Sequence, residues 1–460
     1  MSAPCASTRA LWRAACLVGL VAAATVAVSQ EQPAGPLAQA AGELGLDLTQ
    51  PLSLQQCTAL AIVAHPDIAA AVADLEASQA ALTQARAGLF PSVELSADYS
   101  VVKQAARQVQ TGGQVITVSG GEFTDQNQRA TLSYTFWRTG RDQPIAQARR
   151  YLEAAEASRR DAERRLEYTV AQAFFNVLAA RRLADVAREQ VASWQEHLNM
   201  VQAQIDAGSA APVDVHTVRA DLAQARLSQI QADNSVASSQ AQLRASLGSV
   251  GEAVQVQADF APPSGMLLLD EAQQLALAHR PDLQQLAANL AATKLAVRVA
   301  QLGTQPSFSF SGQAEYGRYS GFLADSWGLF GQVTYPLFDG HLTQSRVRQA
   351  KANLTAQGAG LASVRNSVLV EVETQWLAIR EAAERIAASQ EGVAEARTAL
   401  DVARGRYPDL AIILEVTDAQ LQLNTAEVNA VQALYDYHVA DAALTQAIGG
   451  LAVRALGPPE

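Results

Sequence analysis

The stretch LVEVETQWLAIREAAERI, residues 369–386, lies inside a helical pattern that continues without a proline from residue 341 to residue 406. Its apolar side chains recur every three or four residues, which places them on one face of a helix. They are Leu369, Val372, Trp376, Ile379, Ala383 and Ile386. At roughly 1.5 Å per residue the whole pattern would form a helix about 100 Å long. Helices of ordinary globular domains are far shorter.

This arrangement occurs twice in the chain. The long pattern is followed by a break at Tyr407-Pro408-Asp409-Leu410 and by a second helical pattern that ends at Ile448. The same order occurs earlier, over residues 141–247. There the matching apolar positions are Val191, Trp194, Leu198, Val201 and Ile205. An internal repeat overrides the usual inference of two or three domains from 460 residues. We therefore expect one unit made of two tandem copies.

Each copy begins with two short helical patterns separated by a proline, Pro66 or Pro281. Proline excludes the preceding residue from a helix and suits the first turn of the next one. A second proline follows 25 residues later in both copies, at Pro91 and Pro306. The expected helices are residues 54–63 and 68–89 in the first copy and 269–278 and 283–302 in the second.

Beyond Pro91 and Pro306 the polarity alternates with a period of two, which predicts strands. A return strand follows each, so we expect one β-hairpin per copy, at about 92–138 and 307–338. The loop of the first hairpin includes Thr111-Gly112-Gly113. Aromatic residues gather in both regions, as in a lipid-facing band or in the core of a small soluble sheet. Two isolated hairpins are not stable in water, and four strands cannot close a barrel. We therefore favour a barrel closed by several chains.

The remaining boundaries complete this organisation. Gly140 and Gly340 mark the turns into the long helices. In order, we expect a signal peptide (1–29), an extended segment (30–51), a first repeat (52–250), a linker (251–268), a second repeat (269–449) and a tail (450–460). The first repeat contains a long helix (141–207) and a return helix (213–247). The second contains a long helix (341–406) and a return helix (414–448). A soluble coiled-coil rod would explain the helices but not the hairpins.

The N-terminal residues read as a secretory signal. Arg9 and Arg13 precede an apolar run at 16–28, and small residues predict cleavage between Ser29 and Gln30. The alternative is a membrane anchor, which requires about 20 apolar residues. Cleavage removes two arginines, so the net charge of −11 becomes −13. An acidic exported chain is a poor nucleic-acid binder. No later run reaches about 18 apolar residues, so any membrane-spanning part would consist of strands.

No pattern typical of catalysis or metal binding emerges. The six histidines lack metal-ligand spacing, and Cys57 is the only cysteine beyond the signal. The glycine pairs at 112–113 and 120–121 lie in a strand loop and do not form a phosphate-binding turn between a strand and a helix. We therefore expect no cofactor, no metal and no enzymatic activity.

Four features together resemble the TolC-like outer membrane efflux protein family over essentially the whole mature chain. They are residues 61–67 with their copy at 277–282, the strand starts at Pro91 and Pro306, the run Tyr335-Pro336-Leu337-Phe338-Asp339-Gly340, and residues 415–421. The resemblance implies an α+β membrane protein that forms a homotrimer. Each chain would give four strands to a twelve-stranded barrel in the outer membrane, and the helices would form a coiled-coil tunnel in the periplasm. The implied partners are a periplasmic adaptor (membrane fusion) protein and an inner-membrane pump or ABC exporter.

The chain departs from the family pattern in two places. The family usually has a glycine in the helix turn of the second half. Here Gly208 occupies the first turn, whereas residues 407–411 contain no glycine. The lipid-attachment cysteine of one branch of the family is also missing after the apolar run. We therefore predict no lipid anchor.

The resemblance places acidic residues at the narrow periplasmic end, where this chain has Glu415 and Asp418. They are three residues apart and so share a helix face. Threefold symmetry would make each a ring of carboxylates that favours cations. Asp214 would add a ring, and Arg406 and Tyr407 would bond across neighbouring helices to keep the end closed. Alternatively, all five are solvated residues at helix ends, where acidic side chains are favoured in any case.

These observations lead to one functional hypothesis and two alternatives. We expect a passive outer membrane channel of a tripartite efflux or type I secretion system, gated at its periplasmic end by partner proteins. The alternatives are a non-channel periplasmic coiled-coil scaffold or adaptor, and an enzyme.

Overall fold

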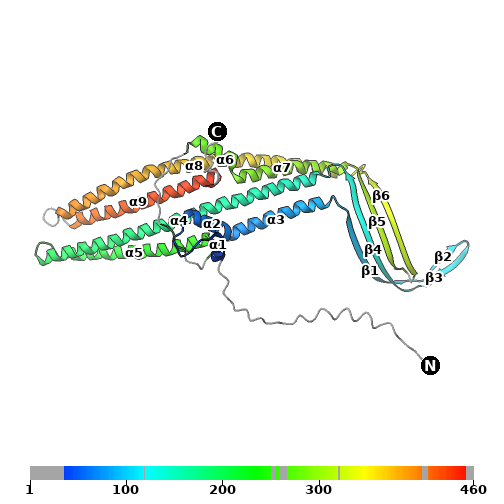
Figure 1. Ribbon diagram of the computed structural model, residues 1–460, viewed down its shortest axis with the longest axis horizontal. Coiled ribbons are helices and arrows are strands. Elements are labelled where there is room, and N and C mark those ends of the chain that lie inside the picture. The colour runs from blue at the N-terminus through cyan, green and yellow to red at the C-terminus, as the bar shows by residue number, and fades with distance from the viewer. Residues whose placement is uncertain are drawn as a thin grey trace, which may run out of the picture.

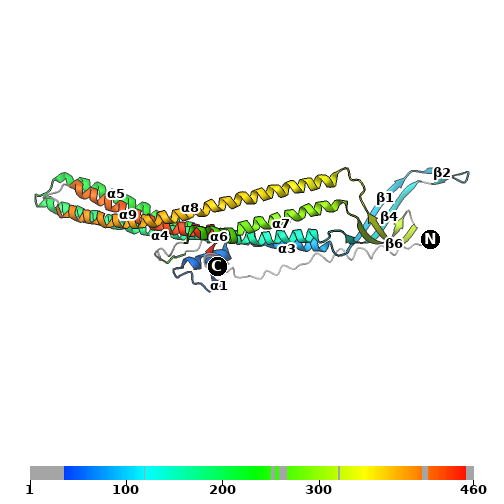
Figure 2. The same ribbon diagram turned by 90° about the horizontal axis from the view of Figure 1, so that it is seen from above.

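The computed structural model describes residues 36–118, 120–249, 254–257, 267–319, 322–406 and 413–451. The chain is elongated, with long helices at one end and an antiparallel sheet at the other (Figure 1). A view turned by 90° keeps both helix tips at the end opposite the sheet (Figure 2). The sheet and the tips are therefore the two ends of the molecule.

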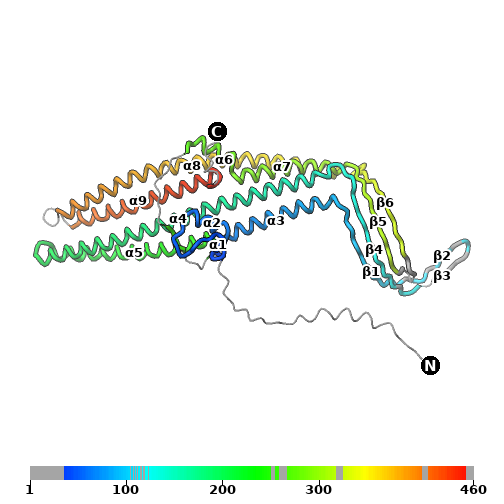
Figure 3. Tube along the Cα trace, viewed as in Figure 1, coloured from blue at the N-terminus to red at the C-terminus, as the bar shows by residue number. Residues whose placement is uncertain are grey.

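The order of elements repeats once along the chain, as the tube in Figure 3 shows. The first copy contains α2 (Leu54–Ala64), α3 (Pro66–Ala87), β1 (Ser92–Gln104), β4 (Gly121–Arg138), α4 (Gln143–Asp206) and α5 (Pro212–Ser246). The second contains α6 (Leu269–His279), α7 (Pro281–Gln301), the 3-10 turn η1 (Leu302–Thr304), β5 (Ser307–Tyr319), β6 (Phe322–Thr334), α8 (Leu342–Arg406) and α9 (Ile413–Ile448). The two long helices begin within two residues of their expected starts.

The shorter helices pack along the two long helices. Both α3 and α5 pack on α4, while α7 and α9 pack on α8. The stacked arrangement follows from proline at the first position of α3 and α7, which sets a fresh helix direction after each corner. In addition, α4 packs on α7 and α9, which joins the two copies along their length.

The four long strands form one antiparallel sheet in the order β1-β4-β5-β6. Because side chains alternate, the register places Glu94, Asp98, Arg129 and Glu315 on one face. The other face carries large exposed apolar side chains: Val93, Leu95, Tyr99, Tyr316, Trp327, Leu329 and Val333. One face is therefore mainly polar and the other mainly apolar.

The predicted hairpins differ from the structure in two respects. No strand was predicted within the loop of the first hairpin, but that loop contains a separate two-stranded sheet, β2 (Arg107–Thr111) and β3 (Gln114–Val118). Gly112 and Gly113 both have positive φ at its turn, which glycine adopts at no steric cost. The second return strand was predicted to reach Phe338 but ends at Thr334. Pro336 lacks the N–H that a continuing strand needs.

The segment predicted as extended, residues 30–51, contains a helix, α1 (Pro36–Leu44). Leu37, Ala40 and Ala41 of this helix are buried in the core beside α2. Burial of these apolar side chains stabilises a helix whose composition alone did not reveal it. Ser29 and Gln30, the predicted cleavage site, lie outside the described residues.

The predicted apolar helix faces are buried, but in different places. Val372 and Ile379 lie in a core cluster formed by α6, α7, α8 and α9, with Trp376 at its edge. Trp194 and Val201, by contrast, lie in a cluster close to the helix tips. The prediction that the two stretches are equivalent partners was wrong. Both long arms carry apolar faces over most of their length, so periodicity could not align them.

No single described helix is apolar and long enough to cross a membrane, although α2 and α3 meet that criterion as a pair bent by 50°.

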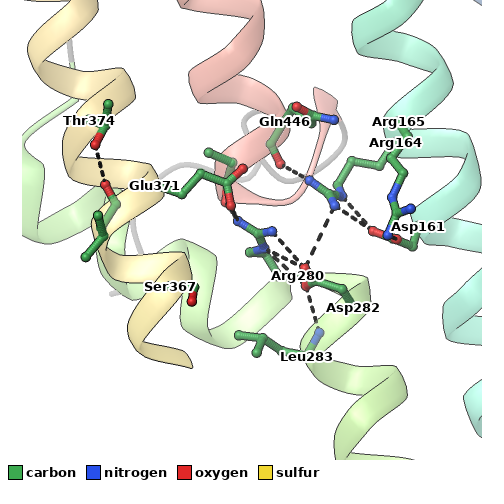
Figure 4. Close-up of polar contacts among 12 residues, drawn as sticks. Asp161, Arg164, Arg165, Arg280, Asp282, Leu283, Ser367, Glu371, Thr374 and Gln446 are labelled. Atoms are coloured by element: carbon green, nitrogen blue, oxygen red, sulfur yellow. Dashed lines mark hydrogen bonds and ion pairs between the residues drawn. The ribbon is translucent and has the colours of Figure 1, made fainter. Parts of the chain in front are cut away.

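Two buried arginines connect the repeats near the middle of the molecule (Figure 4). Arg280, at the corner between α6 and α7, pairs with Asp282 and Glu371, each at 2.7 Å, and donates to the carbonyl of Ala447. Its guanidinium bonds and charge hold the pKa of Asp282 below its ordinary value, although burial alone would raise it. One charged network therefore spans α7, α8 and the end of α9.

Arg164 of α4 extends this network. It pairs with Asp161 at 2.6 Å, donates to the carbonyl of Gln446 at 2.7 Å and lies 3.9 Å from Asp282. The side chains of Arg164 and Arg280 are each only 5% exposed. The first copy is thereby held to the second.

We expect Arg280→Met to lower the free energy of unfolding by about 3 kcal/mol, because it leaves partly buried carboxylates without their counter-charge. Chemical denaturation followed by circular dichroism measures this loss. The matched control is Arg385→Met, whose partner Asp436 lies 2.6 Å away at the surface. The control should cost less than about 1 kcal/mol. Equal losses would show that burial of the Arg280 network adds nothing.

Candidate functional site at the helix tips

The first helix turn is closed by glycine, as expected. Gly208 follows the end of α4 with φ +77° and donates its N–H to the carbonyl of Ile205. The N–H and the hydroxyl of Ser209 both bond to the carbonyl of Gln204, at 2.9 and 3.0 Å. These bonds satisfy the last carbonyls of the helix, and Pro212 then begins α5. The turn is therefore short and well defined.

The second turn, residues 407–412, lies outside the described residues. Tyr407 and the run Pro408-Asp409-Leu410 therefore remain predictions. Arg406 is the last residue of α8 and is exposed.

The acidic candidates lie at the starts of the return helices. Glu415 and Asp418 are exposed in the first turns of α9, while the intervening Val416 and Thr417 are buried. The two carboxylates therefore share the outward side of that helix, as their spacing predicted. Asp214 is half-buried at the start of α5, in the other tip. The structure thus brings Glu415 and Asp418 together and places Asp214 on a different hairpin.

Behind these charges lies an apolar core shared by both tips. It is built by α4, α5, α8 and α9, and its buried members are Trp194, Val201, Val215, Val218, Leu222, Ala225, Leu400, Val416, Ala419 and Leu423. Because all four helices contribute, neither tip can move far without exposing apolar surface. Loss of such contacts costs about 25 cal/mol per Å².

A polar link crosses this core, and sequence reasoning missed it. Arg404 of α8 donates to the hydroxyl of Ser193 at 2.6 Å and to the amide oxygen of Gln420 at 3.0 Å. The Ser193 hydroxyl in turn donates to the same oxygen at 2.9 Å. The link ties α4 of the first copy to α8 and α9 of the second. No spacing rule predicts a contact between a serine and an arginine 211 positions apart. The only signal in the sequence was that Gln420 lies within the family-like run at 415–421.

His197 is buried in the same core, with its ring centroid 5.9 Å from that of Trp194. Burial, assisted by the nearby charge of Arg404, lowers the pKa of His197 to about 4. The ring is therefore neutral at pH 7. Burial also raises the pKa of Asp221 on α5. Among the described residues, no group of three His, Cys, Asp or Glu side chains could hold a metal ion.

Comparison with known proteins agrees with this architecture. The outer membrane efflux protein family matches residues 58–249 and 272–450. Outer membrane protein TolC of Vibrio cholerae is 25% identical over 405 residues, covering 84% of this chain and 88% of that protein. The pyoverdine export outer membrane protein OpmQ of Pseudomonas aeruginosa is 26% identical over 412 residues, with 85% and 83% covered.

Solved structures share the fold. The outer membrane protein VceC of Vibrio cholerae superposes with a TM-score of 0.73 at 20% identity, over 86% of this chain and 96% of that one. The outer-membrane channel OprN gives a TM-score of 0.72 at 21% identity, over 86% and 90%. This chain belongs to the outer membrane efflux protein family.

Family membership confirms the predicted fold class of long tunnel-forming helices with an antiparallel sheet that contributes to a barrel. It also confirms the outer membrane location with a large periplasmic helical part, and the function as an efflux channel. It favours the channel over the periplasmic scaffold. Members of the family are conduits rather than enzymes.

We expect the stability of the folded protein to fall as the pH drops from about 6.5 towards 4. In that pH interval His197 takes up a proton in the unfolded chain. In the folded chain it stays neutral, because its pKa is about 4. The decrease in the free energy of unfolding that is attributable to His197 is on the order of 3 kcal/mol. It is measured by chemical denaturation at pH 7.5, 6, 5 and 4.5.

His197→Leu should remove this part of the pH dependence. His438, whose pKa is also lowered by burial, remains in both proteins and cancels in the comparison. The exposed His216 of α5 provides the matched control, since His216→Leu should retain the wild-type profile. A His197→Leu profile parallel to that of the wild type would contradict the assignment.

Proposed function

We propose that three copies of this chain form a passive conduit across the periplasm and the outer membrane. The observation that carries this proposal is the open four-stranded sheet, whose end strands are β1 and β6. End strands present unpaired backbone N–H and C=O groups, which in lipid must find partners. Pairing of β6 in one chain with β1 in the next would satisfy them and close a twelve-stranded barrel.

The two faces of the sheet support the same assembly. The apolar face, which includes Leu95, Trp327 and Leu329, suits contact with lipid, and the face with Asp98 and Arg129 suits a watery lumen. Along α8, Val370, Leu377 and Val402 are exposed by 63%, 50% and 54%. Neighbouring chains in a helical tunnel would cover side chains of this kind.

The helix tips would be the regulated end of the conduit. The apolar core behind them and the Arg404 link hold the two hairpins together, which suits a closed resting state. Glu415 and Asp418 would then form rings at the entrance, with Asp214 as a further ring. Arg406 and Tyr407 would bond across neighbouring helices. A periplasmic adaptor and an inner-membrane pump or ABC exporter would dock here and supply the energy, since the conduit itself performs no chemistry.

Export to this location would follow removal of residues 1–29 by cleavage between Ser29 and Gln30. N-terminal sequencing of the purified protein tests the position of the cut.

The purified protein should form trimers and give stepwise conductance in a planar lipid bilayer. The trimer is measured by light scattering after subtraction of the detergent, and conductance by single-channel recording. A rod that remains in solution without detergent and gives no conductance would rule out the conduit. Trimers that lack a closed barrel would still give the circular dichroism spectrum of a helical protein but would show no conductance steps.

For the gate, we expect Glu415→Ala with Asp418→Ala to raise the concentration of a trivalent cation needed for half-block by about tenfold, because carboxylate rings attract multivalent cations. The measurement is single-channel current at increasing hexaamminecobalt on the periplasmic side. Glu391→Ala with Glu395→Ala removes the same charge from the exposed side of α8 and serves as the control. Unchanged block in the first variant would remove both residues from the gate.

A further inference from the structure

A band of positive charge lies where the helices meet the sheet. It consists of the ten residues of each helix nearest to a strand: 78–87 of α3, 143–152 of α4, 292–301 of α7 and 342–351 of α8 (Figure 1). We call this band the basic collar. It contains eight Lys and Arg residues and no Asp or Glu: Arg86, Arg149, Arg150, Lys294, Arg298, Arg346, Arg348 and Lys351.

The collar contrasts with the rest of the chain. The whole chain has 34 basic and 45 acidic residues, for a net charge of −11. Without the eight collar cations it has 26 basic and 45 acidic residues, for a net charge of −19. An acidic chain has therefore gathered nearly a quarter of its cations at one level.

The collar has little counter-charge of its own. All eight side chains are exposed. Within the described part of the chain, Arg150 pairs with Glu153 at 2.6 Å, and no other collar residue forms an ion pair. Like charges confined to one band repel one another. Anions from outside the chain would relieve that repulsion.

The width of the collar matches the edge of a bilayer. At roughly 1.5 Å per residue, ten residues of helix span about 15 Å. The headgroup region on each side of a bilayer is about 5–7 Å thick. Beyond it, charges still interact over a Debye length of about 8 Å in physiological salt. With the sheet in the hydrocarbon, the whole collar is within electrostatic reach of lipid phosphates.

Exposed aromatic side chains lie between the apolar face of the sheet and the collar. Phe90 precedes β1, Trp137 lies near the end of β4, and Tyr335 and Phe338 follow β6. Aromatic rings of this kind are enriched at membrane–water interfaces. Along the molecule the order is therefore apolar strands, aromatic rings and cations. A bilayer presents hydrocarbon, interface and phosphate in the same order.

The connections between strands and helices show which side of the sheet is involved. They carry one cation, Arg141, and two carboxylates, Asp142 and Asp339. The guanidinium of Arg141 lies 5.5 Å from the ring centroid of Tyr134. Tyr134 pairs with Phe310, and this pair lies on the apolar face of the sheet. Positive charge thus adjoins the face that suits lipid.

We propose that the basic collar binds the anionic headgroups of phospholipids in the periplasmic leaflet of the outer membrane. Cations next to a membrane-spanning part attract anionic lipids in this way. The proposal rests on the membrane position of the sheet, which the conduit also requires. Attraction of anionic cargo into the lumen would not explain why the cations of all four helices are confined to one level beside the sheet.

The test inserts the full chain into vesicles of equimolar phosphatidylglycerol and phosphatidylcholine, in which one of the two lipids carries brominated acyl chains. Bromine quenches the fluorescence of a tryptophan that it contacts. Trp137 is the reporter, because it lies at the helix end of the apolar face. All proteins carry Trp327→Phe, since Trp327 is exposed farther along that face. Trp194 and Trp376 lie in helical cores away from acyl chains.

We expect phosphatidylglycerol to contact Trp137 at least about threefold more often than phosphatidylcholine at low salt, because the collar attracts its charge. The preference should disappear in about 1 M NaCl, where the Debye length is about 3 Å.

Two variants with equal changes in charge are compared. The collar variant replaces two pairs of cations that share helix faces and should lower the preference at least about twofold. Its substitutions are Lys294→Gln, Arg298→Gln, Arg348→Gln and Lys351→Gln. The control variant replaces four exposed arginines far from the sheet and should keep the wild-type preference. Its substitutions are Arg182→Gln, Arg219→Gln, Arg226→Gln and Arg365→Gln. Glutamine is a good helix former, so both variants should keep the circular dichroism spectrum.

Equal quenching by the two lipids in the wild type, or equal reductions in the two variants, would overturn the proposal. So would a collar variant that keeps the lipid preference but changes the reversal potential in a KCl gradient, since its cations would then line the lumen. These results leave the conduit standing, because quenching by either lipid shows that the sheet lies in the membrane. Absence of quenching by both lipids would contradict the collar proposal and the conduit together.

Discussion

The pairing of two buried guanidinium groups with carboxylates from several helices underlies the rest of this architecture. Arg164 and Arg280 meet around Asp282, at the level where the short helices of each copy end and the return helices arrive. Helix ends leave carbonyl groups without partners. Here the carbonyls of Gln446 and Ala447, near the end of α9, accept from the two arginines. The network thus satisfies a buried helix end and joins the repeats with the same charges.

Different interactions stabilise the two ends of the molecule on either side of that junction. Towards the sheet, backbone hydrogen bonds and the alternation of polar and apolar side chains organise the strands, as a structure between water and lipid requires. Towards the tips, apolar faces of four helices share one core. The charged side chains Glu415 and Asp418 lie at the surface of the tips, while His197, buried in the core, is neutral at pH 7. This separation suits a closed end that presents charge to solvent and resists spreading from within.

Local patterns predicted the elements well because their causes are local. Pro66 and Pro281 act on their own backbone, and Gly208 is needed for a positive φ at one residue. The i, i+3 spacing of Glu415 and Asp418 likewise sufficed to place them on one helix side. The helix α1 was missed, since tertiary burial of Leu37 stabilises it. The β2–β3 hairpin was missed because no strands were assigned within the loop of the first hairpin.

The amino-acid order alone was enough to establish the duplication, the long helices, the strands and the family resemblance, since each depends on periodicity or on a residue's own conformational limits. It did not reveal which distant side chains meet. Two features arise only when helices from both copies pack together: the contacts of Arg404 with Ser193 and Gln420, and the network around Arg280. Burial then strengthens each interaction by excluding water, and burial is a property of the packed fold rather than of sequence spacing.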